Sequence, residues 1–225
     1  METFLSNFLA SIVAGIVIII GAALFSKKAK WIFTGLVARL MDIDIDSVYE
    51  SKKEAQHDLR ADFKKSKHVA ILTGRGNEFQ RDTFGQLFSR ALNNSVHVRI
   101  LLPETSLKHG EYDWTMQRDE EVAKFDQAFG KGVLGKQINI NVEFLQKYLE
   151  SGEVELRRFN YPHIGRIIIT EKYAYFSPYL AHAHGRDAKI YKYRRGGEMY
   201  ENYQRLFEQL WTAGESSESQ ASQAG

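Results

Sequence analysis

The sequence predicts an α/β protein in which an N-terminal transmembrane helix is followed by a mixed β-sheet domain flanked by helices. Three observations support this prediction. Residues 4–25 form an uncharged, mostly apolar run, residues 68–102 read as strand, helix and strand, and Ile167–Ile169 opens the pattern of a β-hairpin. A long apolar run is typical of a membrane span, and short β-branched runs are typical of buried strands.

The composition limits the classes of function. The chain has 225 residues, no cysteine and a formal net charge of +2. Such a balanced charge does not favour nucleic-acid binding by bulk electrostatics, so we expect any anion site to be local. The lack of cysteine excludes disulfides, thiol catalysis and zinc-thiolate sites.

The first predicted region, residues 1–30, is the transmembrane helix with its basic flank. As a helix, residues 4–25 would be roughly 33 Å long, enough to cross a hydrocarbon core of about 30 Å. Lys27, Lys28 and Lys30 follow the run, so the positive-inside rule predicts an outside N-terminus, a single pass through the plasma or inner membrane and a cytoplasmic C-terminal domain. Small residues at Ser6, Ala10 and Ala14 lie on one helix face and favour self-association into a homo-oligomer, although small residues are also common in membrane helices in general. A cleaved signal peptide is the alternative.

The second region, residues 31–66, is predicted to hold interfacial and stalk helices. Trp31–Met41 fits a helix at the inner membrane surface, anchored by Trp31, and fits equally a continuation of the first helix. Ser47 with Glu50 reads as a capping box that opens a helix to about Lys65. That helix carries only a thin apolar stripe, which is typical of a stalk that packs on one neighbour.

The third region, residues 67–213, is the predicted domain. Strands at 68–72 and 96–102 flank an amphipathic helix at 79–92, which predicts a β-α-β unit with parallel strands. Asn77 with Gln80 resembles a capping box for that helix. A helix at 116–129, a flexible basic lid over 130–136, and a helix at 142–149 are expected next. Strands at 154–159, in the hairpin over 161–179 and at 189–194, with a last helix at 199–211, complete the domain. Residues 214–225 are predicted to be disordered.

Two segments carry candidate ligand-binding residues. The strand-to-helix turn of Thr73, Gly74, Arg75 and Gly76 offers backbone N–H groups, a helix dipole and a guanidinium to a phosphate, although a simple turn explains it as well. In the hairpin, His163, Arg166 and Ser177 are expected to meet at one end.

Arg186, in the loop after the hairpin, is a further candidate anion ligand. His182 and His184 lie on one face of an extended segment, but no third ligand accompanies them at suitable spacing, so no metal and no cofactor are predicted.

The order of elements over residues 67–212 resembles one half of a phospholipase D-like domain. In that superfamily the signature is His-x-Lys, four residues and Asp, with a Gly-Ser beyond; two halves face each other, and one His attacks phosphorus. His163 matches the His, whereas Gly165 stands at the Lys position and Thr170 at the Asp position. The resemblance therefore implies a phosphate pocket that lacks the groups needed to neutralise phosphoryl charge and to orient the imidazole.

These observations predict a membrane-anchored sensor or effector. Its degenerate phospholipase D-like domain would bind a phosphorylated small molecule or a nucleotide and alter the association of transmembrane helices, as in small bacterial proteins of antiviral defence. One alternative is an active homodimeric phosphodiesterase, a nuclease or phospholipase, that uses His163. Another is a structural membrane protein with a vestigial pocket.

Overall fold

The central element of the fold is a mixed β-sheet. The computed structural model describes residues 2–25, 27–41, 44–106, 112–162, 164–180, 185 and 187–216. Within these residues the sheet has eight strands in the order β1-β7-β6-β5-β2-β3-β4-β8. The strands are β1 (Ile45–Tyr49), β2 (His68–Leu72), β3 (His97–Pro103), β4 (Val154–Phe159), β5 (Gly165–Thr170), β6 (Tyr173–Pro178), β7 (Ile190–Arg194) and β8 (Glu215–Ser216). The helices are α1 (Glu2–Phe25), α2 (Lys27–Leu40), α3 (Lys52–Lys65), α4 (Asp82–Leu92), α5 (Trp114–Ala123), α6 (Val133–Leu149) and α7 (Glu198–Ala213).

The strand directions divide the sheet into two parts. Strands β2, β3 and β4 are parallel to one another, which confirms the predicted β-α-β unit. Strands β5, β6, β7 and β1 continue the sheet from β2 with antiparallel pairs. All residues of β5 are buried, as expected for a strand covered on both faces, and this explains its run of three isoleucines.

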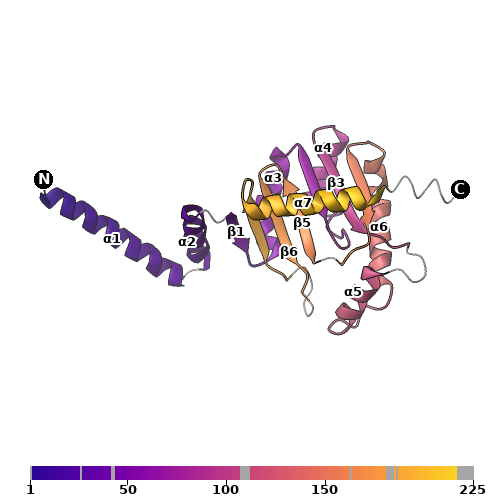
Figure 1. The fold of residues 1–225 in the computed structure, drawn as a ribbon, viewed down its shortest axis with the longest axis horizontal. Coiled ribbons are helices and arrows are strands. Elements are labelled where there is room, and N and C mark those ends of the chain that lie inside the picture. Colours follow the sequence, from indigo (N-terminus) through magenta and orange to yellow (C-terminus); the bar gives the residue numbers. More distant parts are fainter. Residues whose placement is uncertain are drawn as a thin grey trace.

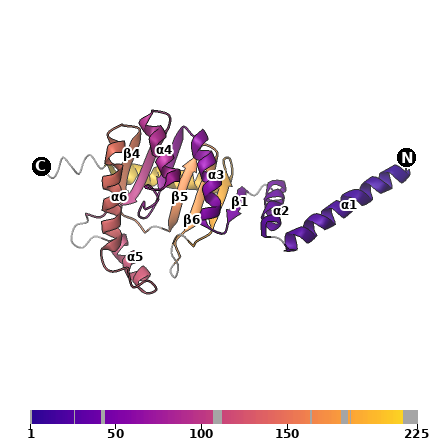
Figure 2. The ribbon, with the colours of Figure 1, turned by 180° about the vertical axis from the view of Figure 1, so that it is seen from behind.

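Helices cover both faces of the sheet. Helix α7 crosses one face (Figure 1), where Phe207 and Trp211 pack on Leu101, Ile167 and neighbouring residues of the sheet. The opposite face is covered by α3, α4 and α6, as seen from behind in Figure 2. The predicted class, a mixed sheet flanked by helices, is thus confirmed for this part of the chain.

The N-terminal helices lie beside this layered domain rather than on it (Figures 1 and 2). Helix α1 covers the predicted apolar segment, residues 4–25. No helix in the part of the chain that the structure describes is long and apolar enough to cross a membrane, so the predicted transmembrane helix is not supported.

The structure corrects the predicted stalk helix. Ser47 is part of β1, which pairs with β7, so the capping box at Ser47 and Glu50 is wrong. The helix begins four residues later in the sequence: Ser51 is the N-cap of α3, and its side chain accepts a hydrogen bond of 3.4 Å from the backbone N–H of Glu54. The apolar stripe of α3 is buried in the core rather than exposed along a stalk. Strand β1 and helix α3 thus belong to the sheet and to one of its helical layers.

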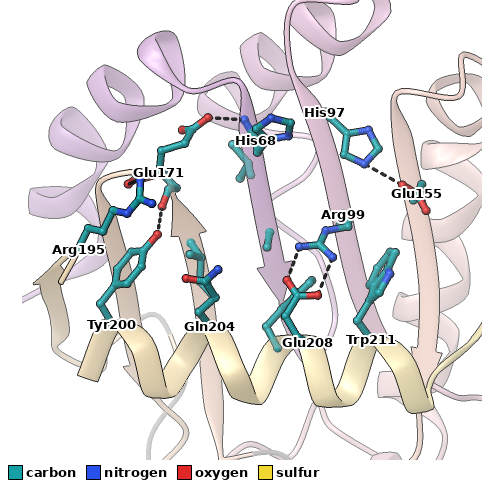
Figure 3. A pocket seen from close by; sticks show the side chains of 15 residues that line it. His68, His97, Arg99, Glu155, Glu171, Arg195, Tyr200, Gln204, Glu208 and Trp211 are labelled. Carbon is teal, nitrogen blue, oxygen red and sulfur yellow. Dashed lines mark hydrogen bonds and ion pairs between the residues drawn. The ribbon is translucent and has the colours of Figure 1, made fainter. Parts of the chain in front are cut away.

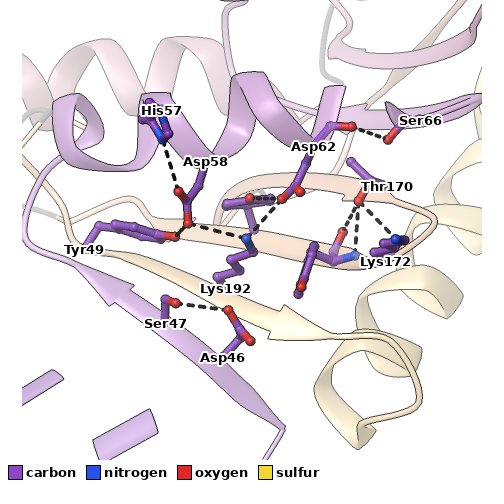
Figure 4. Close-up of polar contacts among 12 residues, drawn as sticks. Asp46, Ser47, Tyr49, His57, Asp58, Asp62, Ser66, Thr170, Lys172 and Lys192 are labelled. Carbon is purple, nitrogen blue, oxygen red and sulfur yellow. Dashed lines mark hydrogen bonds and ion pairs between the residues drawn. The ribbon is translucent and has the colours of Figure 1, made fainter. Parts of the chain in front are cut away.

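A buried polar network fixes α3 to the sheet (Figure 4). The ammonium of Lys192, on β7, lies 3.1 Å from Asp62 and 3.6 Å from Asp58, both on α3. Tyr49 of β1 donates a hydrogen bond of 2.5 Å to Asp58, and Tyr175 of β6 donates to Asp62. Because the network joins three strands to α3, the middle and the last turns of this helix are held in one position relative to the sheet.

Helices α4 and α6 differ from the predictions at their N-terminal ends, whereas α5 ends at Ala123 rather than at residue 129. Helix α4 begins at Asp82 with Arg81 as N-cap, and no side chain caps it, so the capping box at Asn77 and Gln80 is wrong. Helix α6 begins at Val133, inside the segment predicted as a lid. The buried Asp119 of α5 accepts a hydrogen bond of 3.0 Å from the N–H of Leu134 and so caps α6 from outside. This contact replaces the expected flexible loop over 133–136.

The C-terminal segment is described only at its start. Residues Glu215–Ser216 form β8, which pairs with Arg157 and Arg158 of β4. The predicted disorder of the rest of this segment lies outside the described residues.

Candidate functional site

The turn after β2 lies at the carboxyl end of the parallel strands. Gly76 adopts φ +75°, a conformation that favours glycine. The N–H of Gly74 donates a hydrogen bond of 2.9 Å to the hydroxyl of Tyr179, and a Cβ on Gly74 would lie only 2.9 Å from the ring of Trp114. Gly76 therefore allows the chain to bend, and Gly74 allows the aromatic rings to approach the backbone closely.

Asn141, on α6, holds the same turn from the other side. Its side chain is buried, and its amide donates to the carbonyl of Arg75 at 2.8 Å and to Asn77 Oδ1 at 2.8 Å. Its carbonyl accepts from Gln80 at 3.1 Å. The residues predicted to cap α4 thus bind Asn141 instead, and the turn keeps a fixed shape.

The hairpin brings a second set of predicted residues to this edge of the sheet. Arg166 of β5 is the direct partner of Ser177 on β6. Ile168 and Tyr175 belong to the core under α3, α4 and α6, and side chains two residues apart share a face. Arg166 and Ser177 therefore point toward the same helical layer, and both are buried.

Both sets line one cavity of about 320 Å³. Six of the predicted site residues contribute to its wall: Thr73, Gly74, Arg75, Gly76, Arg166 and Ser177. The cavity opens where strands β2 and β3 end, which is where open α/β sheets hold their ligands. Whether these residues bind a ligand stays a prediction, but the structure places them side by side. His163 and Arg186 lie outside the described residues.

The described wall of the cavity carries five cationic side chains and one carboxylate. They are Lys52, Arg75, Arg81, Arg118, Arg166 and Glu78. Excess positive charge in a partly enclosed space favours an anionic ligand, because the low dielectric of the walls strengthens the attraction. The small net charge of the whole chain conceals this local excess.

Glu78 is bound by two of these cations. One of its oxygens, Oε1, contacts both the ammonium of Lys52 and the guanidinium of Arg166. Burial lowers the pKa of Lys52 to about 8, although Glu78 opposes this shift. Burial raises the pKa of Glu78, but the charges of Arg166 and Lys52 outweigh that effect, and the pKa falls below its usual value. Glu78 is therefore a carboxylate at neutral pH.

The outer cations are held by other contacts. Arg75 donates to Gln137 at 2.9 Å and lies over the ring of Phe129. Arg118 pairs with Glu121 at 2.8 Å and lies over the ring of Tyr179. Such contacts keep long side chains in place, so less conformational entropy is lost when an anion binds.

A second cavity lies at the opposite end of the strands, between α7 and the sheet (Figure 3). It is larger, about 510 Å³. However, the charges of its described wall are nearly balanced and mostly paired. Arg99 forms two bonds to Glu208 of 2.8 and 2.5 Å, His97 lies 2.7 Å from Glu155, and Glu171 accepts two backbone N–H bonds of 2.7 Å. We assign no ligand to it.

No group of three or more His, Cys, Asp or Glu side chains suited to a metal ion occurs among the described residues. His182 and His184, considered above as a possible pair of ligands, lie outside them.

Several residues of the cavity were missed by sequence reasoning. Lys52 was not a candidate because its helix was predicted to begin at Ser47 and to form a stalk outside the domain. Glu78 lies two residues after Gly76, and a carboxylate so close to a cationic turn is the local sign that a cation is paired there. Trp114 and Arg118 come from α5, whose position relative to the turn has no signature in the sequence.

Fold and site thus define an α/β protein with a cationic cavity at the carboxyl edge of its parallel strands. No protein-family model matches the chain, and no curated protein sequence matches it.

Solved structures resemble the chain at low identity. TrmBL2, an archaeal chromatin protein, is 13% identical with a TM-score of 0.48, over 96% of this chain and 69% of that one. Nuc from Salmonella typhimurium, a phospholipase D family member, is 13% identical with a TM-score of 0.46, over 76% and 97%. Phosphatidylserine synthase from Haemophilus influenzae is 15% identical with a TM-score of 0.47, over 76% and 40%. At TM-scores below 0.5 such likeness does not define the activity of this chain.

Proposed function

We propose that this protein binds a phosphate-bearing ligand in the cavity at the carboxyl edge and acts as a sensor or effector rather than as a hydrolase. One observation carries the proposal. Residues chosen from the sequence as phosphate ligands, in two distant segments, line a single cavity whose described wall has five cations and one carboxylate. Concave sites with a few convergent charged groups are typical of small-molecule binding.

Two features support binding over cleavage. Gly165 stands where the resemblance would require a Lys, and a Cβ there would lie 2.6 Å from both the ring of Phe176 and the carbonyl of Ser177. A longer side chain would not fit without a shift of β6. Thr170 stands where the Asp is expected, and its hydroxyl accepts from Tyr173 N–H at 3.1 Å in the turn between β5 and β6. Neither residue can supply the charge that the reaction needs.

The ligand is a nucleotide or another phosphorylated small molecule, and its binding would change the association of the N-terminal helices. Membrane location, self-association and a role in antiviral defence remain predictions from the sequence. An active phosphodiesterase that uses His163 is the alternative function. Because His163 lies outside the described residues, the turnover assay below tests this alternative.

Calorimetric titration of the full chain with pyrophosphate, AMP and glycerol 3-phosphate tests the proposal. We expect binding of at least one of them, and about tenfold weaker binding when Arg75 and Arg81 are both replaced by Ala, because two charge-assisted contacts are lost. Lys53→Ala is the matched control, since Lys53 is exposed on α3 and is not part of the cavity wall. The absence of binding by all three probes would reject the proposal.

A turnover assay on bis(p-nitrophenyl) phosphate separates binding from hydrolysis. We expect no turnover above that of the His163→Ala variant. Activity that is present in the parent protein and lost in this variant would instead identify an active phosphodiesterase.

A further inference from the structure

The cationic cavity already contains an anion that belongs to the protein. Glu78 Oε1 is shared by Lys52 and Arg166, and the three side chains are 18%, 16% and 9% exposed, respectively. A carboxylate oxygen between two cations is the arrangement that a phosphate oxygen would adopt with the same partners. Lys52 and Arg166 are therefore paired with an anion inside the cavity before any ligand arrives.

The pairing of Glu78 with Lys52 and Arg166 is mostly buried, so a ligand that enters this part of the cavity must interact with it. Because Glu78 is ionised and mostly buried, a phosphate placed beside it would meet a like charge in a low-dielectric space. A phosphate that replaced it would take over both cations and would allow the carboxylate to return to water. Replacement avoids the repulsion, whereas simple addition does not.

We propose that Glu78 is an internal counter-anion of this site, and that a phosphate group binds to Lys52 and Arg166 by displacing it. The proposal rests on the proposed function and adds two residues to it: Lys52 as a binding residue and Glu78 as the group that sets the threshold for binding. Glu78 lies in the turn before α4, and we expect a rotation of its side chain to withdraw the carboxylate. Arg81, exposed and three residues further along, lies at the same cavity.

The exchange also changes what holds the start of α3. Lys52 is the first residue of that helix, next to the N-cap Ser51. In the ligand-free protein the Lys52–Glu78 pair joins this first turn to the segment before α4. Once Glu78 leaves, that joint is replaced by a contact to the ligand. Ligand occupancy is thus coupled to the short segment, residues 50–51, that connects β1 to α3.

The test compares two charge-removing variants of the full chain, with pyrophosphate as the probe. Glu78→Gln removes the internal anion and keeps the shape of the side chain. Glu121→Gln is the matched control: it removes one negative charge from the partner of Arg118, another cation of the same cavity, and leaves Lys52 and Arg166 untouched. We expect Glu78→Gln to bind pyrophosphate about tenfold more tightly than the parent protein, and Glu121→Gln to change the affinity by less than about threefold.

Hydrogen exchange supplies a second measurement. In the parent protein, pyrophosphate should change the amide exchange rate of residues 51–56 only slightly, because a contact from Lys52 to the ligand replaces the Lys52–Glu78 joint. In Glu78→Gln the rate for this segment should be high without ligand and should fall when pyrophosphate binds. Thermal unfolding monitored by circular dichroism confirms that each variant is folded, and Glu78→Asp, which withdraws the carboxylate by one methylene, serves if Glu78→Gln does not fold; its affinity should also rise.

The possible outcomes separate the two proposals. If the parent protein binds pyrophosphate but neither folded Glu78 variant binds it more tightly, the counter-anion role is wrong and the proposed function stands. An equal gain in Glu121→Gln would likewise overturn the exchange, since bulk charge would explain it. If neither the parent protein nor a folded Glu78 variant binds any phosphate probe, both proposals fail.

Discussion

Replacement of Asn141 by Ala should both destabilise the protein and weaken its candidate site. The amide of Asn141 donates to the carbonyl of Arg75 and to Asn77, and its carbonyl accepts from Gln80. The amide also reaches the carbonyl of Gln137 at 2.9 Å, so the substitution removes four contacts at a buried position. These amount to about three full hydrogen bonds, because the amide has only two N–H protons. At about 1 kcal/mol each, the loss is about 3 kcal/mol of unfolding free energy, or a fall in Tm of roughly 6–12 °C for a domain of this size.

Urea unfolding followed by circular dichroism measures this loss, with Asn139→Ala as the matched control. Asn139 lies on the same helix but is exposed, and it accepts a single hydrogen bond of 2.8 Å from Thr105. We expect the control to lose less than about 1 kcal/mol. The Asn141→Ala variant should also bind phosphate probes more weakly, because the turn loses its fixed shape. A loss below about 1 kcal/mol for Asn141→Ala would refute the view that this residue holds the turn.

Three further predictions test the packing and the charges. Gly76→Ala should lose at least about 1 kcal/mol more stability than Gly152→Ala: both positions have φ near +76°, but only a Cβ at Gly76 meets a ring, that of Phe79 at 2.5 Å. Similar losses in urea unfolding would contradict this. Lys192→Met should cost about 3–5 kcal/mol, because it leaves Asp58 and Asp62 without their cation, whereas exposed Lys189→Met should cost less than about 1 kcal/mol. Lys52 has a pKa of about 8 in the folded protein and about 10.4 when unfolded, so the unfolded chain binds more protons between these values and stability should rise with pH there. Urea unfolding from about pH 8 to 9.5, below the range in which unfolded tyrosines ionise, should show a flatter slope for Lys52→Met; an unchanged slope would exclude Lys52 as its source.

The elements that could be predicted are those whose pattern is local. The β-branched run at Ile167–Ile169 and the turn at Glu171 predicted the hairpin, and β5 and β6 confirm it. Strand β4 has the predicted bounds, Val154–Phe159. In β5, which is buried over its whole length, the β-branched composition is itself the signal, since both faces of the sheet are covered.

Elements that depend on distant partners were misplaced. Strand β1 has only five residues and exists because it pairs with β7, almost 150 positions away. No local pattern separates Ser47 from Ser51 as a helix N-cap, because each precedes a Glu by three residues. Ser47 lies in a strand rather than at a helix N-cap because its neighbour Val48 is buried in the sheet. Likewise, α6 begins early because Asp119, from another helix, caps it.

The candidate site was predictable in its two sequence segments but not in its electrostatics. Arg166 and Ser177 were expected at one hairpin end, and their cross-strand pairing confirms that geometry. Their meeting with the turn of Gly74 depends on the antiparallel pairing of β5 with β2, which the sequence does not specify. The pairing of Glu78 with Lys52 depends on the tertiary position of α3, so the sequence could not show that this cation of the site is already paired.

The position of β1 has a mechanical consequence. The chain passes from α2 almost directly into this edge strand, and Asp44, just before it, accepts two further backbone N–H bonds, from Arg194 at 3.0 Å and Met199 at 2.6 Å. A tension applied through the N-terminal helices along the strand would load the β1–β7 ladder in shear, so its hydrogen bonds would resist together rather than one at a time. Strand β1 would then act as a stiff coupling, which passes displacement on to the first turn of α3 before it yields.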